Sequence, residues 1–170
     1  MDFLSLAEAR YSVRSFKPDP VPTEVIEKII KAGLVAPTAC NNQPEKIIAV
    51  STNDGLERFR RCTECHYNAP LGFIVGYDKT RCWKSEITPK TSGDIDASIV
   101  ATHMMLEAAS LGIGSTWVMY FIPEAVKAEF ALGYNIEPVA LLVMGYPADD
   151  AKPSKMHDSF RDKSEIVSYE

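Results

Sequence analysis

The segment from Ile95 to Leu111 constrains the fold more than any other part of the sequence, because apolar residues occupy nearly every face of the helix that it would form. A helix that is apolar all round has to be buried. Asp94 is the expected N-cap, and Gly112 is the expected C-terminal stop. The apolar positions are Ala97, Ile99, Val100, Met104, Met105, Leu106, Ala108 and Leu111. We therefore expect this helix at the centre of the domain or in a subunit interface.

Apolar periodicity and turn residues predict the remaining elements. A capping box formed by Ser5 and Glu8 is expected to begin the first helix, which ends near Arg10, and Thr23 is expected to begin the second. Further helices are predicted over 56–62 and 123–132. Strands are predicted over 46–51, 71–77, 114–120 and 138–146, with 166–169 as a further candidate. Residues 53–55 are predicted to form a turn, and 79–93 a mobile surface loop.

Length and charge limit the classes of function. With 170 residues, 46% of them hydrophobic, the sequence predicts one domain over 1–170, with 147–170 as an extension too polar to form its own core. A net charge of −5 argues against nucleic-acid binding. The first ten residues do not resemble a secretory signal, and no apolar run is long enough to cross a bilayer. The four cysteines are then expected to be free thiols in a cytoplasmic protein that binds no membrane.

A loop over 36–44 joins the second helix to the first long strand and is rich in amide and hydroxyl groups. Pro37 and Pro44 restrict its backbone at both ends, while Thr38, Asn41 and Gln43 can hydrogen-bond a flat polar ligand. We interpret this loop as a flavin-binding segment. The alternative is a capped helix-to-strand turn, because Asn and Pro are common in loops.

A second polar segment covers 10–16. In an extended conformation, Arg10, Ser12 and Arg14 would project on one side, since side chains alternate along a strand. Two guanidinium groups and a hydroxyl suit a phosphate together with ribityl hydroxyls or ring carbonyls. The alternative is a half-buried strand whose polar side faces water.

Four segments, taken together and in this order, resemble the nitroreductase family of FMN-dependent oxidoreductases, in the short form that lacks the large insertions of longer members. These segments are 10–16, 36–44, 108–117 and 164–170. The likeness covers nearly the whole chain. It implies an α+β fold with a central, mainly antiparallel sheet flanked by helices. It also implies a homodimer whose subunits exchange their C-terminal extensions and hold one FMN at each end of the interface.

The resemblance also implies the cofactor-binding residues. One subunit would supply Arg10, Tyr11, Ser12 and Arg14, while Pro37, Thr38, Ala39, Asn41 and Gln43 would come from the other subunit or border the ring. Backbone N–H groups around Met119 and Tyr120 would point at flavin N5 and O4. Arg161 is the best match for the basic residue that completes the phosphate site. Lys155 and Lys163 are rival candidates, because the tail departs here from the commoner pattern of the family.

The same resemblance implies the reaction. NADH or NADPH would reduce the flavin and leave, and a small electron-poor acceptor such as a nitroaromatic or quinone would take its place, which is a ping-pong mechanism. No catalytic side chain is required; Arg10 or Arg14 would place positive charge near N1 and O2. No Gly-x-Gly-x-x-Gly motif occurs, which agrees with transient nicotinamide binding. The alternative within this fold is a flavoenzyme with another reaction, such as dehalogenation, flavin fragmentation or dehydrogenation.

A cysteine cluster offers a rival site of a different class. Cys62, Cys65, His66 and, further along, Cys82 contain the ligand types that bind zinc or iron. A single C-x-x-C motif is a weak signal, so a non-enzymatic metal or thiol module is the less favoured interpretation. Spare cysteines on a basic helix and a loop account for the same residues.

Overall fold

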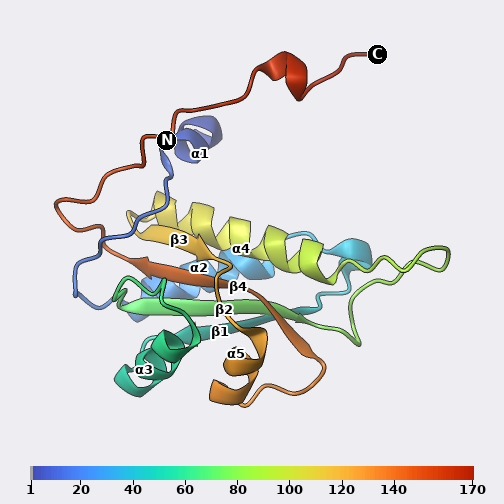
Figure 1. Cartoon of the computed structure of the whole chain (residues 1–170), viewed down its shortest axis with the longest axis horizontal. Helices are drawn as coiled ribbons and strands as arrows, with labels where there is room; N and C mark the ends of the chain where they lie inside the picture. Colours follow the sequence, from blue (N-terminus) through green and yellow to red (C-terminus); the bar gives the residue numbers. More distant parts are fainter. Residues whose placement is uncertain (1) are drawn as a thin grey trace.

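The structure is a computed structural model, and it describes residues 2–170. A four-stranded antiparallel sheet forms its centre, with the strands in the order β1-β2-β4-β3 (Figure 1). The strands are β1 (Glu45–Val50), β2 (Leu71–Asp78), β3 (Gly114–Val118) and β4 (Ile136–Gly145). The central strands β2 and β4 read as nearly continuous apolar runs, because each is covered on both faces.

Helices cover both faces of the sheet. On one face, α2 (Thr23–Leu34) and α4 (Gly93–Ser110) pack over a core that contains Phe73, Val75 and Leu142. On the other face, α3 (Asn53–Cys62) and α5 (Pro123–Glu129) pack over Ile74, Leu141 and Val143 (Figure 1). Alternate residues of each central strand therefore belong to different cores. The expected α+β fold with a mainly antiparallel sheet is confirmed.

The long apolar helix α4 is buried on only one side of the single chain. Ala97, Val100 and Met104 are fully buried against the sheet and α2, whereas Ile95 is 62% exposed. The helix begins at Gly93 with Ser92 in the N-cap position, so the prediction of Asp94 as N-cap is wrong. Asp94 lies in the first turn, where a carboxylate still interacts favourably with the helix dipole.

Several other predicted boundaries differ from the structure. Helix α1 (Phe3–Ala9) is capped by Asp2, whose carboxylate accepts a hydrogen bond from the Ser5 N–H, so the predicted Ser5–Glu8 capping box is wrong. The predicted turn over 53–55 is the first turn of α3, because the Thr52 hydroxyl accepts from the Gly55 N–H and caps the helix. Residues 119 and 120 lie beyond the end of β3.

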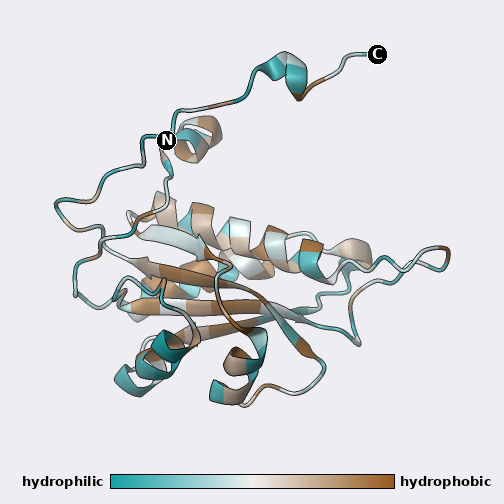
Figure 2. Ribbon diagram, viewed as in Figure 1, coloured by the Kyte–Doolittle hydropathy of each residue, from teal (hydrophilic) through white to brown (hydrophobic). Residues whose placement is uncertain are grey.

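The C-terminal tail leaves the body of the domain after β4. Pro147 forms an isolated bridge with Phe16, and the chain then runs past α1 and away from the sheet (Figure 1). Its last regular element is the short 3-10 helix η2 (Lys163–Glu165). The predicted strand over 166–169 is wrong, because these residues pair with no strand within 2–170. The tail is coloured mostly as hydrophilic in Figure 2, and it is almost entirely exposed.

Within the part of the chain that the structure describes, no helix combines the length and the apolar composition needed to cross a membrane.

Candidate functional site

The segment 10–16 lies along β3, which is an edge strand of the sheet. Ser12 bridges Ser115 in a parallel arrangement, and the Val13 N–H donates to the Ser115 carbonyl at 3.0 Å. The Thr116 hydroxyl donates to the Val13 carbonyl. A Cβ atom at Gly114 would lie 2.7 Å from the Val13 side chain, so only glycine permits this close approach. The segment is therefore extended, as the sequence predicted.

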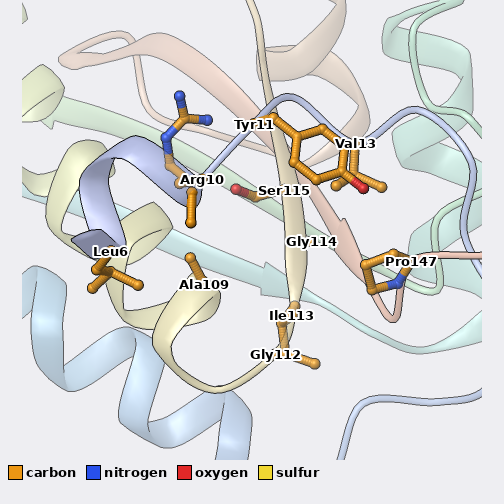
Figure 3. Close-up of a pocket in the computed structure, with 11 residues that line it drawn as sticks. Leu6, Arg10, Tyr11, Val13, Ala109, Gly112, Ile113, Gly114, Ser115 and Pro147 are labelled. Atoms are coloured by element: carbon orange, nitrogen blue, oxygen red, sulfur yellow. The ribbon is translucent and has the colours of Figure 1, made fainter. Parts of the chain in front are cut away.

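A small cavity of about 170 Å³ lies between this segment and the C-terminal end of α4 (Figure 3). Arg10 and Tyr11 line it together with Ser115 and Ala109, and Pro147 closes one side. Arg10 Nη1 and Ser115 Oγ are both buried and have no hydrogen-bond partner within residues 2–170. Because an unpaired buried polar atom is costly, these two atoms mark a place for a polar ligand.

Arg14 lies on the exposed side of the same segment and donates from Nη1 to the Ser12 carbonyl at 3.2 Å. It also lies near a turn over 63–68, in which Tyr67 and Asn68 have positive φ angles of 49° and 51°. Burial raises the pKa of the Tyr67 hydroxyl, Cys65 raises it further, and Arg14 lowers it. Backbone strain of this kind is concentrated at functional sites. Sequence reasoning missed this turn, although its Asn68 was the one residue typical of a left-handed turn.

The loop over 36–44 contains the short 3-10 helix η1 (Ala39–Asn41) and is strained. Cys40, Asn41 and Gln43 all have φ angles near 50°, which only asparagine among the three adopts with ease. The Thr38 hydroxyl accepts a hydrogen bond from the Gln43 N–H at 3.1 Å and so closes the loop on itself. An ordinary helix-to-strand turn does not require three left-handed residues, so the loop has a specific shape to maintain.

Asp96 holds this loop against α4. Its side chain is only 2% exposed, and its two carboxylate oxygens accept from the Ala39 N–H at 2.9 Å and from the Ser92 hydroxyl at 2.6 Å. Sequence reasoning missed Asp96. The available signal was a carboxylate within a run of apolar residues, because a buried charge requires partners.

The two polar segments lie at opposite ends of α4. The loop contacts Asp96 near the N-terminal end, and the cavity beside Arg10 includes Ala109 near the C-terminal end. At about 1.5 Å per residue these two positions are about 20 Å apart along the helix. A second cavity of about 560 Å³ adjoins the loop and is lined by Trp83 and Ile95. One chain therefore does not bring the two predicted parts of the site together.

Met119 and Tyr120 follow β3 and are 72% and 73% exposed. Their position is fixed by the buried Thr63, whose hydroxyl donates to the Tyr120 carbonyl at 2.7 Å and accepts from the Cys65 N–H at 3.0 Å. The turn that follows α3 and the segment that follows β3 are thus joined through one hydroxyl group. Thr63 had no role in the sequence interpretation.

None of the three basic tail candidates, Lys155, Arg161 and Lys163, lines the Arg10 cavity. Arg161 pairs with Glu165 at 3.1 Å, and the ammonium group of Lys163 lies 5.3 Å from the ring centre of Tyr169. Lys155 is exposed. His157 also lies near the segment 10–16, since its ring packs edge-on against Tyr11 with 6.2 Å between centroids.

The cysteine cluster does not converge on one point. Cys62 belongs to the core on the α3 and α5 side of the sheet, whereas Cys82 belongs to the core on the α4 side. His66 accepts a hydrogen bond from the Asn68 N–H through Nδ1. No group of three His, Cys, Asp or Glu residues within 2–170 is arranged to hold a metal ion. The metal module proposed as a rival interpretation therefore lacks a site among these residues.

The fold defines an α+β protein in which two helices cover each face of an antiparallel sheet and polar segments lie at both ends of the longest helix. The sequence profile of the Nitroreductase family matches residues 7–65 and 64–146. The chain belongs to the nitroreductase family, as the resemblance of its four segments predicted. Membership of this family makes it an oxidoreductase.

Individual relatives agree with this assignment. A nitroreductase family protein from Clostridium difficile 630 is 38% identical in sequence, and its solved structure superposes with a TM-score of 0.94 over 100% of this chain and 99% of that one. A provisionally named NADH dehydrogenase/NAD(P)H nitroreductase from Methanothermobacter thermautotrophicus is 28% identical over 95% of this chain and 85% of its own length. An FMN-dependent nitroreductase from Clostridium difficile R20291 shares the fold, with 23% identity and a TM-score of 0.80 over 98% of each chain.

Proposed function

We propose that this protein is an FMN-dependent oxidoreductase that passes electrons from NADH or NADPH to a small electron-poor acceptor such as a nitroaromatic or a quinone. The observation that carries the proposal is the pair of buried polar atoms at Arg10 and Ser115 that lack a hydrogen-bond partner within residues 2–170, in a cavity beside a second arginine. A phosphate and ribityl hydroxyls would satisfy them. The names of the relatives, which include NAD(P)H nitroreductase and FMN-dependent nitroreductase, support the same cofactor and co-substrate.

The functional unit in this proposal is a homodimer. Arg10 and the loop over 36–44 lie at opposite ends of α4, so a two-fold axis across this helix would bring the loop of one subunit to the arginine segment of the other. The outer side of α4 supports such an interface. Ile95, Ile99 and Leu106 line an open apolar groove of about 570 Å³ there, together with Phe3 of α1. Exposed apolar surface of this kind is typical of an interface.

Each segment then has a separate task. Arg10, Tyr11, Ser12 and Arg14 would bind the phosphate and ribityl chain, and Pro37, Thr38, Ala39, Asn41 and Gln43 of the second subunit would border the ring. The backbone at Met119 and Tyr120 would orient the ring edge. Bound FMN supplies the redox chemistry by taking up electrons from the nicotinamide and passing them, in a separate binding event, to the acceptor. The chain itself contributes orientation and positive charge.

The decisive measurement is the visible absorption spectrum of the purified protein, before and after anaerobic addition of NADPH and then NADH. A flavin spectrum that bleaches is the expected result, and the nicotinamide that bleaches it is the co-substrate. A flavin that stays oxidised would contradict the nicotinamide reaction and favour another flavin chemistry on the same fold. A protein that binds no FMN even when FMN is added would contradict the proposal as a whole.

A further inference from the structure

A third cavity, of about 390 Å³, opens between the C-terminal end of α3 and the segment that follows β3. Exposed apolar groups in its wall come from Met119, Tyr120 and Ile122, and the last turn of α3 supplies Arg60 and Arg61. The proposed function assigns the backbone of Met119 and Tyr120 to the flavin edge, so the cavity adjoins the proposed site of electron transfer. Its volume suits a single substituted aromatic ring.

Most of the positive charge around this cavity is neutralised by partners. Arg61 forms a bidentate pair with Glu129, with distances of 2.8 and 2.7 Å, and Arg58 pairs with Asp54 at 3.2 Å. Neither guanidinium is therefore free to attract a ligand strongly.

Arg60 differs from its two neighbours. It has no ion-pair partner within 4.0 Å among residues 2–170. Its Nε atom is also buried without a hydrogen-bond partner there, a property that it shares with the Nε atom of Arg58. The exposed Glu64 also lines the cavity, but its carboxylate forms no ion pair with Arg60. Burial and, to a smaller extent, the positive charge of Arg60 lower the pKa of His66, which places the guanidinium of Arg60 close to this turn.

We propose that this cavity binds the electron acceptor and selects aromatic acceptors that carry a carboxylate or a similar anionic group, with Arg60 as the residue that holds the anion. The inference rests on the proposed function, because it assigns a substrate class to the same redox site. Apolar side chains would contact the ring, and the guanidinium would form charge-assisted hydrogen bonds with the anion. The C-terminal end of α3 carries partial negative charge, so without Arg60 the cavity would disfavour an anion.

The test measures binding to the oxidised, FMN-loaded protein without nicotinamide, so it does not depend on turnover. The probes are 4-nitrobenzoate and the neutral 4-nitrobenzamide, which match in shape, and isothermal titration calorimetry gives both dissociation constants. We expect the wild-type protein to bind the benzoate more tightly than the amide, and Arg60→Met to weaken benzoate binding about tenfold relative to amide binding. Lys46→Met, which removes one positive charge from the exposed side of β1, is the matched control and should leave this ratio within about twofold of the wild-type value.

Equal affinity of the wild-type protein for the two probes, or an unchanged ratio in Arg60→Met, would overturn the proposal. If Arg60→Met does not fold, the salt dependence of probe binding to the wild-type protein still tests the proposal. Raising NaCl from 0.1 to 0.5 M should weaken the benzoate more than the amide, and an equal response would count against an anion site. A flavin that nicotinamides fail to bleach would refute the proposed function while leaving this binding result intact, so the two failures are distinguishable.

Discussion

The carboxylate of Asp96 and the backbone N–H of Ala39 form a hydrogen bond of 2.9 Å that joins the first turns of the central helix to the strained loop over 36–44. The second carboxylate oxygen is used as well, since it accepts from the Ser92 hydroxyl. The loop contains three residues with left-handed backbone angles, which cost energy unless surrounding contacts hold them. Asp96 is therefore a positioning residue for the loop that we assign to the ring of FMN.

Replacing Asp96 with alanine should release the loop. The Ala39 N–H and the Ser92 hydroxyl would lose a charged acceptor, and we expect the free energy of unfolding to fall by about 2–3 kcal/mol. Urea denaturation measures this loss. Because the loop would no longer be held in its strained form, FMN retention through dialysis should fall as well.

Asp94→Ala is the matched control, because Asp94 lies on the same helical turn but is exposed. It should cost no more than about 1 kcal/mol, through the lost interaction with the helix dipole. Asn at position 96 keeps the shape and one acceptor, so Asp96→Asn should recover part of the FMN binding. If the alanine variant loses stability but retains FMN as the wild type does, the loop has no part in cofactor binding.

Thr63 offers a second test, since its hydroxyl joins the turn after α3 to the Tyr120 carbonyl. Thr63→Val keeps the volume and removes both hydrogen bonds, so we expect a loss of about 1–3 kcal/mol in unfolding free energy. If the Tyr120 segment orients the flavin, the variant should also reduce the rate of flavin bleaching by NADPH in stopped-flow absorption. Thr63→Ser restores the hydroxyl and should restore the rate; a slow serine variant would point to packing instead.

The pH dependence of stability should contain a contribution from Cys62. Burial, with a smaller contribution from Glu129, raises the pKa of this thiol from 9.0 to about 11. A raised native pKa means that the unfolded chain loses this proton first. The stabilising contribution is thus complete below pH 9 and is lost as the pH rises towards 11. Urea midpoints of the wild type and Cys62→Ala, compared at pH 8, 9 and 10, should converge as the pH rises; parallel curves would refute the shift.

Much of the fold was predictable from local patterns. The continuous apolar run of β2 and the one-sided periodicity around Ile29 are properties of the segments themselves, so their type was clear from sequence. Helix boundaries were less predictable. Asp94 and Asp96 both satisfy the residue preferences of a helix start, and only the contact of Asp96 with Ala39, which are 57 positions apart, shows the different roles of the two carboxylates.

The conformation of a proposed site segment could be predicted where it depends on one segment alone. The extended form of 10–14 was expected from its alternation, and β3 confirms it by pairing with Ser12. The cavity beside Arg60 depends instead on a contact between the end of α3 and the segment after β3. No periodicity in the sequence indicates that contact. Whether an arginine is paired or free is likewise decided by partners far along the chain, as Arg61 and Glu129 illustrate.

The two arginines of the segment 10–16 should determine how tightly FMN is bound. Arg10→Ala and Arg14→Ala each remove a guanidinium assigned to the phosphate or the pyrimidine edge, and we expect the dissociation constant of FMN to rise about 10- to 100-fold. Fluorescence titration of the apoprotein with FMN measures it. Lys17→Ala is the control, because Lys17 pairs with Asp149 at 2.8 Å in this structure. Unchanged FMN affinity in Arg14→Ala would refute the role assigned to that residue.

The last prediction concerns the basic residues of the tail. Arg161 is the favoured partner for the FMN phosphate, yet among residues 2–170 it pairs only with Glu165, which is four residues away and largely exposed. An exposed pair of this kind contributes little, so the guanidinium can exchange it for a phosphate at small cost. We expect Arg161→Ala to weaken FMN binding about tenfold, and Lys155→Ala and Lys163→Ala to change it less than twofold. Fluorescence titration with FMN compares all three. A larger loss in either lysine variant would transfer the phosphate contact to that lysine, and equal affinity in all three would exclude the tail from the cofactor site.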